Sequence, residues 1–232
     1  MVANVTLSKG PEGPADSSDE TGVLDIRHFL LLLLDEGLTL FYQPFAAKAV
    51  EPQLFGALIS ATSAFYSEGS SPVGYRIPQD LDVRGYRLSA SYGGLVTGVL
   101  LHQGCVSEKI VGGVERFVEL FESQYRLVVT RWSGDTHLFN VTDLRRDLFE
   151  SLNCTDLLPH EITYRGMLSL QRGSYGTILA GLRKYSARLG HFFIGDVVSR
   201  LASSWDWPPQ SIYHLLSEMR SKGLINPALS SV

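Results

Sequence analysis

The sequence predicts an α+β fold: a five-stranded antiparallel sheet with the element order β-β-α-β-β-β-α-α, followed by a small C-terminal all-α domain of helix-turn-helix type. Three observations lead to this prediction. Two apolar runs of strand length meet at an acidic turn within residues 26–45, further strand-like runs follow a helical pattern, and only helical patterns follow residue 174. We therefore expect a disordered tail over residues 1–21, an α/β domain over 22–156 and a helical domain over 157–232.

Residues 26–45 are expected to form the β-hairpin around which the rest of the sheet is arranged. Its two apolar runs flank Asp35-Glu36-Gly37, and the glycine can adopt the positive φ that a tight turn needs. The first run holds five consecutive leucines, Leu30 to Leu34, which indicates a strand covered on both faces in the middle of the sheet. With the element order above, we expect the two strands of the hairpin to be the central pair of the sheet. If the chain's own helices cannot cover both faces, a partner chain must. A membrane span would need about 20 apolar residues, and this run ends at Asp35.

The rest of the first domain follows in order. Pro52 opens a helix whose apolar face carries Leu54, Phe55, Leu58, Ile59 and Phe65. Three strand candidates come next, over residues 73–77, 81–92 and 95–101, with Gly93-Gly94 as a hairpin turn. We expect a second helix from the cap Ser107 to about residue 130 and a third helix capped by Thr142.

Helical patterns dominate the C-terminal region. They cover residues 175–189 and 194–201, and a third helix begins after Trp205-Asp206-Trp207-Pro208-Pro209 and ends at Lys222-Gly223. Residues 160–174 fit either a linker or an extra short element. The charge also divides the chain, because residues 160–232 carry a net charge of +4 against −8 for the residues before them. This asymmetry suggests two modules with different partners.

The first domain resembles the longin fold, a relative of the roadblock and profilin-like sheets, in the form found in archaeal proteins associated with small GTPases. The resemblance covers residues 23–155 and rests on the turn Asp35-Glu36-Gly37 with Leu40-Phe41, on the small-residue helix at 55–59, and on residues 117–139. It implies a non-enzymatic cytoplasmic adaptor that binds a small GTPase, a trafficking-type assembly, another longin or roadblock protein, or a second copy of itself. Longin-like proteins often work at membranes, but the sequence shows no lipidation signal or basic amphipathic helix, so we expect at most peripheral contact with membranes. We take as candidate protein-binding residues Leu38, Leu40, Tyr42, Trp132 and Asp135.

The segment IYHLLSEMRSKGLI, residues 212–225, resembles the last helix of winged-helix domains, which runs into a hairpin wing. The sequence departs from that pattern because seven residues follow Ile225, too few for a wing. The alternative function is therefore a DNA-binding transcription regulator with an N-terminal sensory or dimerisation domain. Side chains that could reach bases or phosphates are Gln210, Ser211, His214, Ser217, Arg220 and Lys222. The competing interpretation is a protein-interaction module that has lost DNA binding.

Catalytic signatures are absent from the sequence. It contains no phosphate-binding loop of the Gly-x-x-x-x-Gly-Lys-Ser/Thr type and no Gly-x-Ser-x-Gly elbow. The six histidines do not recur at metal-ligand spacing, and nothing near Cys105 in the sequence would activate its thiol. We therefore expect no enzymatic activity, no cofactor and no metal. The two cysteines, Cys105 and Cys154, cannot form a disulfide framework, which fits a reducing cytoplasm.

Overall fold

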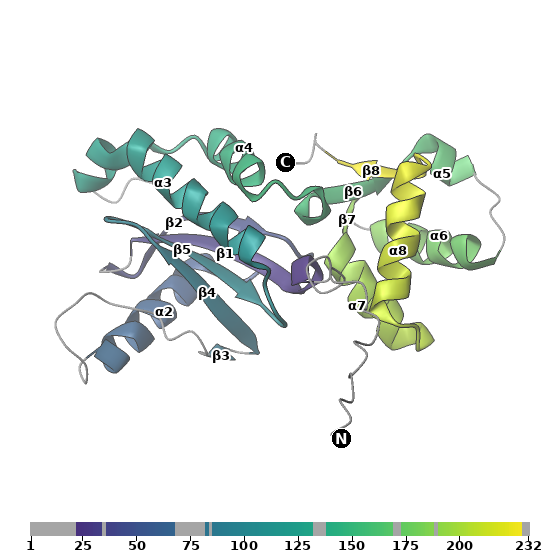
Figure 1. Cartoon of the computed structure of the whole chain (residues 1–232), viewed down its shortest axis with the longest axis horizontal. Helices are drawn as coiled ribbons and strands as arrows, with labels where there is room; N and C mark the ends of the chain where they lie inside the picture. Colours follow the sequence, from purple (N-terminus) through teal and green to yellow (C-terminus); the bar gives the residue numbers. More distant parts are fainter. Residues whose placement is uncertain are drawn as a thin grey trace, which may run out of the picture.

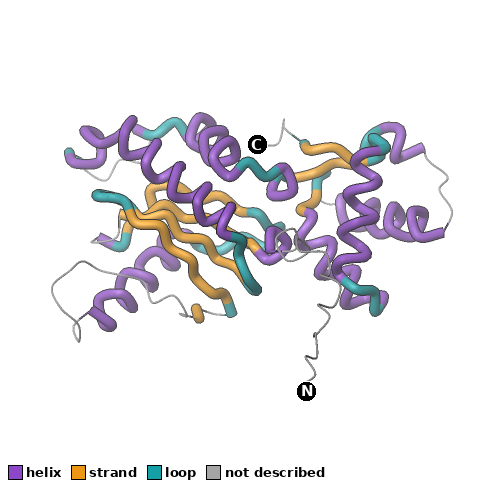
Figure 2. Tube along the Cα trace, viewed as in Figure 1, coloured by secondary structure: helices purple, strands orange, loops and turns teal. Residues whose placement is uncertain are grey.

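A computed structural model describes residues 22–33, 36–67, 82–83, 85–131, 138–168, 173–187 and 190–228. The chain forms a sheet with helices on both faces, and beside it a helical lobe with a smaller sheet (Figures 1 and 2). The elements of the first part are η1 (Gly22–Asp25), β1 (Ile26–Leu33), β2 (Leu38–Pro44), α2 (Pro52–Ser67), β3 (Asp82–Val83), β4 (Tyr86–Tyr92), β5 (Thr97–His102), α3 (Glu108–Thr130) and α4 (Val141–Leu152). Those of the second part are η4 (Thr155–Leu157), β6 (Pro159–Ile162), α5 (Tyr164–Leu168), α6 (Gly173–Ser186), β7 (Phe192–Phe193), α7 (Ile194–Trp205), α8 (Pro209–Ser221) and β8 (Ile225–Pro227). The tail predicted over residues 1–21 lies outside the described residues.

The larger sheet has five antiparallel strands in the order β2-β1-β5-β4-β3, which confirms the predicted α+β sheet. The hairpin forms as expected: Gly37 has φ +68°, and Leu30 faces Tyr42 across the β1–β2 ladder. The prediction that both hairpin strands are central is wrong, because β2 is the edge strand and only β1 is interior. A bulge between Leu31 and Leu32 shifts the register of that ladder.

Both faces of β1 are covered by the chain itself. Leu30 and Leu32 pack with Ile59 of α2, whereas Phe29 and Leu31 pack beneath α3 and α4 on the opposite face (Figure 1). All four of these strand residues are 0% exposed. A partner chain was expected only if the chain's own helices could not cover both faces. For Phe29 to Leu32 they do, so no partner is needed to bury these residues.

Local signals fix several element boundaries. Ser107 caps α3, as predicted, by accepting a hydrogen bond from the backbone N–H of Ile110. The cap predicted at Thr142 is wrong, since α4 begins after Asn140, whose side chain accepts from the backbone N–H groups of Thr142 and Asp143. The strand predicted over residues 81–92 is divided by Gly85, which has φ +83°, into β3 and β4. The strand predicted at residues 73–77 lies outside the described residues.

The C-terminal region is not all-helical, which corrects the prediction for residues 157–232. Its helices accompany a three-stranded sheet in the order β7-β6-β8. The central strand β6 comes from residues 159–162, upstream of all the long helices in this region, and pairs antiparallel with β8 after α8. A compact core fills the region, and its fully buried members include Ile178, Leu182, Phe192, Ile212 and Leu216.

The two regions are packed against each other at the start of β1. Leu24 of η1 is 6% exposed and belongs to the apolar core of the helical lobe, although it directly precedes the larger sheet. Gly195 of α7 allows this close approach, because a Cβ there would lie 2.6 Å from the carbonyl oxygen of Leu24. Within the described residues, no helix is both long enough and apolar enough to cross a bilayer.

Candidate protein-interaction surfaces

The outward face of α2 is an exposed apolar helix face. None of the 16 residues of α2 is charged. Gly56 seats the helix on β2, because a Cβ at this position would lie 2.6 Å from Oγ1 of Thr39. Leu54 and Leu58 point away from the sheet, with exposures of 51% and 37%. Exposed alanines continue the stripe at helical spacing, so the α2 face is formed by Leu54, Ala57, Leu58 and Ala61.

The exposed edge of β2 is partly closed by a side chain of the same helix. The amide of Gln53 accepts a hydrogen bond from the backbone N–H of Thr39 at 3.1 Å and donates one to its carbonyl oxygen at 3.0 Å. This pair imitates the bonds that a neighbouring strand would make. Such blocking is a common protection for an edge strand. A partner strand would have to displace Gln53 before it could pair at this position.

The candidate residues on β2 serve the fold instead of a free surface. Leu40 is 6% exposed and lies in the core beneath α3 and α4, and Leu38 is half-buried. The hydroxyl of Tyr42 lies 3.1 Å from Nδ1 of His28 and accepts a hydrogen bond from the backbone N–H of Val50. The other two candidates, Trp132 and Asp135, lie outside the described residues.

The candidate nucleic-acid residues lie on α8 and just beyond its end. Gln210, Ser211 and His214 are exposed. Arg220 instead forms an ion pair with Asp156 and also donates to Oγ1 of Thr155. Its charge is therefore engaged with the η4 segment within the chain.

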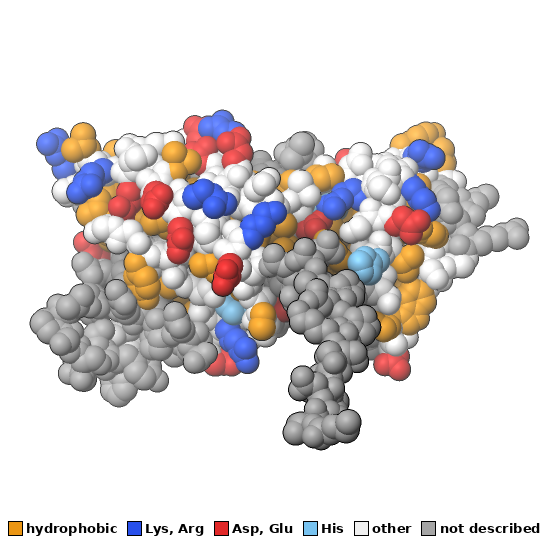
Figure 3. All heavy atoms as spheres, viewed as in Figure 1, with side chains coloured by type: hydrophobic (Ala, Val, Ile, Leu, Met, Phe, Trp, Pro, Cys, Tyr) orange, Lys and Arg blue, Asp and Glu red, His pale blue; other side chains and the backbone are white. Residues whose placement is uncertain are grey.

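Lys222 is engaged in a similar way. Its ammonium group lies 2.8 Å from a carboxylate oxygen of Glu218 and 2.9 Å from the hydroxyl of Tyr175. On the viewed face of the molecule, basic and acidic side chains are interspersed (Figure 3). Nucleic-acid sites usually need a dense basic patch, and α8 presents a polar face whose two basic groups already have partners.

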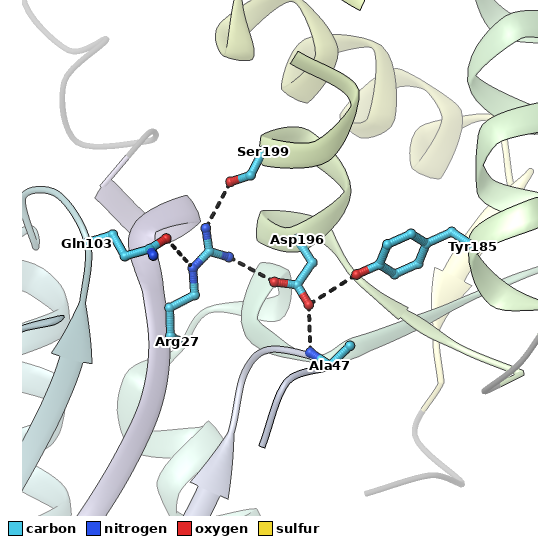
Figure 4. Close-up of polar contacts among 6 residues, drawn as sticks. All are labelled: Arg27, Ala47, Gln103, Tyr185, Asp196 and Ser199. Carbon is cyan, nitrogen blue, oxygen red and sulfur yellow. Dashed lines mark hydrogen bonds and ion pairs between the residues drawn. The ribbon is translucent and has the colours of Figure 1, made fainter. Parts of the chain in front are cut away.

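A partly buried polar cluster around Arg27 joins the sheet to the helical lobe (Figure 4). Arg27 of β1 is 5% exposed, and its guanidinium donates to Oε1 of Gln103 at 3.0 Å and to Oγ of Ser199 at 2.8 Å. It also pairs with Oδ1 of Asp196 at 3.1 Å. The three acceptors come from the end of β5 and from two turns of α7, so one side chain holds both regions.

Asp196 completes this cluster from the other side. Its second oxygen, Oδ2, accepts from the backbone N–H of Ala47 at 2.6 Å and from the hydroxyl of Tyr185 at 3.2 Å (Figure 4). Burial and the neighbouring carboxylate raise the pKa of Tyr185 to about 12, so this hydroxyl stays protonated and donates. The arrangement is typical of a structural ion pair whose remaining hydrogen-bonding capacity is satisfied.

Two further histidines are buried without becoming a site. His28 and His160 are both 0% exposed, and burial lowers the pKa of each to about 4. The Nδ1 atom of His160 lies 2.9 Å from the carbonyl oxygen of Leu158, whereas the Nε2 atoms of both rings have no hydrogen-bond partner among the described residues. Both imidazoles are therefore neutral at pH 7 and pack as core side chains.

The described residues contain no group of three or more His, Cys, Asp or Glu side chains that could hold a metal ion. Burial raises the pKa of the Cys154 thiol, which opposes a role as nucleophile, and Cys105 is exposed. A scan against protein-family models finds no match, and a search of the curated proteins finds no significant match. The interpretation of this chain therefore rests on its own surfaces.

The α2 face had a signal in the sequence. Leu54 and Leu58 fit the periodicity of a core-facing helix, so they were expected to be buried, but no residue over 52–67 is charged, so no charged side marks which face of this helix meets solvent. A single-layer contact with a sheet buries only one side of such a helix.

Proposed function

We propose that this protein is a non-enzymatic adaptor, with a longin-like domain followed by a winged-helix-like module, that binds a small GTPase or a related trafficking-type assembly. The α2 face carries this proposal. A stripe of leucine and alanine at i, i+3, i+4 and i+7 is the pattern by which one helix packs against a helix or groove of another protein. A partner that covers Leu54 and Leu58 would remove their exposed apolar surface from water.

Docking on the α2 face is better supported than addition of a strand to β2. At Thr39 the backbone groups of that edge are already bonded to Gln53. The α2 face needs no such rearrangement, because Leu54 and Leu58 are already exposed. A partner would therefore gain apolar burial there without first breaking internal hydrogen bonds.

The arrangement of elements supports the two resemblances. The order of strands and helices from β1 to α4 is the one expected for a longin-like domain. In the C-terminal region, α8 leads through Lys222-Gly223-Leu224 into β8, as in a winged-helix domain. The strand that pairs with β8 is β6, which precedes α8 in the chain. The residues after Ile225 were expected to be too few to form a second wing strand, and β6 occupies that position beside β8.

A DNA-binding regulator remains the second candidate because of this C-terminal arrangement. The engagement of Arg220 and Lys222 by Asp156 and Glu218 argues for the adaptor instead. A titration with duplex DNA at low salt separates the two, since phosphate contacts strengthen as salt falls. Binding that weakens steeply with added salt would favour the regulator.

The adaptor function is tested by titrating the full chain with purified small GTPases encoded by the same genome. Each GTPase is loaded with GDP or with a non-hydrolysable GTP analogue and measured by biolayer interferometry. The proposal expects saturable binding to at least one of them. An absence of binding to every GTPase in both nucleotide states would contradict it.

A further inference from the structure

A cavity of about 390 Å³ lies between α6 and α7, on helices that the proposed adaptor surface does not use. This volume falls within the range of sites for small molecules, about 300–1,000 Å³. Its lining combines apolar, aromatic and basic side chains: Gly181, Lys184, Tyr185, Val197, Arg200, Leu201, Ser204 and Trp205. This composition resembles that of a ligand site more than that of a packing defect, which would be lined by apolar groups alone.

The walls of the cavity are apolar and partly exposed. Val197 and Leu201 are buried members of the helical core, and Trp205 packs edge-on against Trp207 with ring centroids 5.4 Å apart. Gly181 keeps the hollow open, because a Cβ at this position would lie 3.2 Å from both Leu201 and Trp205. The indole and the aliphatic side chains therefore present a surface that an aromatic or branched apolar group can cover.

Two cations border these walls. Lys184 and Arg200 are exposed, and neither forms an ion pair with any acidic side chain in the described part of the chain. The guanidinium of Arg200 lies over the ring of Tyr185, 5.4 Å from its centroid. That ring is fixed in turn by the hydrogen bond from its hydroxyl to Asp196. One cation is thus held at the cavity by stacking, and its charge remains available.

The carboxylate that contacts the lining residue Tyr185 does not cancel these charges. Asp196 uses Oδ1 for Arg27 and Oδ2 for Ala47 and Tyr185, so both of its oxygens are engaged at the junction with the sheet. An anion that entered the cavity would meet Lys184 and Arg200 while its apolar part contacted the indole of Trp205. The two cations and the apolar walls therefore both favour a ligand that carries an anionic group on an apolar body.

We propose that the α6–α7 cavity binds a small organic anion, a carboxylate or phosphate attached to an aromatic or branched apolar group. The occupant is a free small molecule, because a volume of about 390 Å³ lies within the range of small-molecule sites. Lys184 and Arg200 bind the anionic group, and Val197, Leu201 and Trp205 contact its apolar part. The site gives the helical module a ligand-binding role distinct from partner binding at α2.

Phenyl phosphate is the probe, measured by ligand-observed NMR and by the indole N–H signal of Trp205, which the variant Trp205→Phe assigns. It is compared with inorganic phosphate, which has only the anionic group, and with uncharged benzyl alcohol, which has only the aromatic group. We expect phenyl phosphate to bind about tenfold more tightly than either and to shift the Trp205 signal, since contacts to two exposed cations and apolar burial add. Equal binding of benzyl alcohol, or no saturation by phenyl phosphate at millimolar concentration, overturns the proposal.

Matched variants place the binding in the cavity. Lys184→Gln and Arg200→Gln should each weaken phenyl phosphate by about threefold, whereas Lys109→Gln on α3 should not change it. Ser204→Tyr fills the cavity from its exposed rim and should abolish binding, while Ser203→Tyr on the same helix should leave it intact. Unchanged affinity in Ser204→Tyr contradicts the site without depending on the stability of a core variant.

A final comparison identifies the source of the anion. A hexapeptide that carries adjacent phenylalanine and glutamate residues is titrated in parallel with phenyl phosphate. The proposal expects the peptide to bind more weakly, because a hexapeptide is larger than a cavity of about 390 Å³. Tighter binding of the peptide would assign the cavity to an acidic segment of a protein and overturn the small-molecule proposal.

Discussion

Replacement of Asp196 by alanine is expected to destabilise the folded chain by about 3–5 kcal/mol, because it leaves Arg27 buried without its carboxylate. The exposed fractions of the two side chains are 6% for Arg27 and 17% for Asp196, so the guanidinium would lose its carboxylate at a site with little access to water. The change also removes the acceptor for Ala47 N–H and for the Tyr185 hydroxyl. Arg27 keeps Gln103 and Ser199, which limits the loss to this range.

The double variant Arg27→Met/Asp196→Ala separates the cost of an unpaired charge from that of the pair. With no buried charge left, its destabilisation should be smaller than the sum of the two single changes by about 1–3 kcal/mol. Urea unfolding followed by far-UV circular dichroism gives the four free energies of unfolding. Arg146→Ala removes the exposed pairs with Asp143 and Asp147 and should cost at most about 1 kcal/mol.

Either of two results would contradict a stabilising ion pair between Arg27 and Asp196. One is a loss below about 1 kcal/mol for Asp196→Ala, which would equal a surface pair. The other is strict additivity of the two single changes, which would show that Arg27 and Asp196 do not interact.

The pKa of His160 is lowered by burial to about 4, so between about pH 6.5 and 4 the unfolded chain binds a proton that the folded chain does not, and the free energy of unfolding falls as the pH falls. His160→Asn should reduce this slope by about 1 kcal/mol per pH unit in urea unfolding between pH 7 and 5, with the exposed His214→Asn as the control; an unchanged slope would contradict the assignment. On α3, Gly112→Ala should stabilise the chain by about 0.5–1 kcal/mol, since its Cβ would meet nothing closer than 3.6 Å. Gly113→Ala should instead destabilise it by about 1–3 kcal/mol, since its Cβ would lie 2.9 Å from the Cα of Leu152; equal melting temperatures for the two variants would refute this packing.

Local patterns in the sequence were sufficient for much of the first region. The leucine run predicted a strand buried on both faces, and Ser107 predicted the start of α3, because each signal acts over a few neighbouring residues. The position of β2 at the sheet edge could not be derived this way. Strand order depends on which distant segment pairs with β1, and that segment is β5, some 70 residues further along the chain.

The C-terminal sheet was missed for a related reason. β7 contains two residues and β8 three, which is too short for an alternation of polar and apolar side chains to be seen. Their pairing with β6 is a tertiary contact between segments on either side of the helices. The Arg27–Asp196 pair was equally invisible, since 169 residues separate its members and each looks like an ordinary surface charge in the sequence.

The predicted site residues needed more correction than the predicted fold. The candidate residues Leu38, Leu40 and Tyr42 lie on the hairpin, which was expected to need a partner only if the chain's own helices could not cover both faces. Helices α2, α3 and α4 supply that cover. Leu54 and Leu58 were assigned to the core from their helical spacing, but periodicity alone does not say which side of an uncharged helix faces the sheet. Burial reversed both assignments.

The adaptor account is tested most directly by measuring the affinity of the double variant Leu54→Glu/Leu58→Glu for the GTPase that the parent chain binds. Both side chains are already exposed, so the fold should be retained, while two charges on the α2 face should weaken binding by at least about tenfold. The matched control is Leu127→Glu on α3, where the leucine is 73% exposed and far from α2 in the sequence. Loss of binding in the double variant with parental affinity in the control is the predicted result; parental affinity in the double variant would contradict the account.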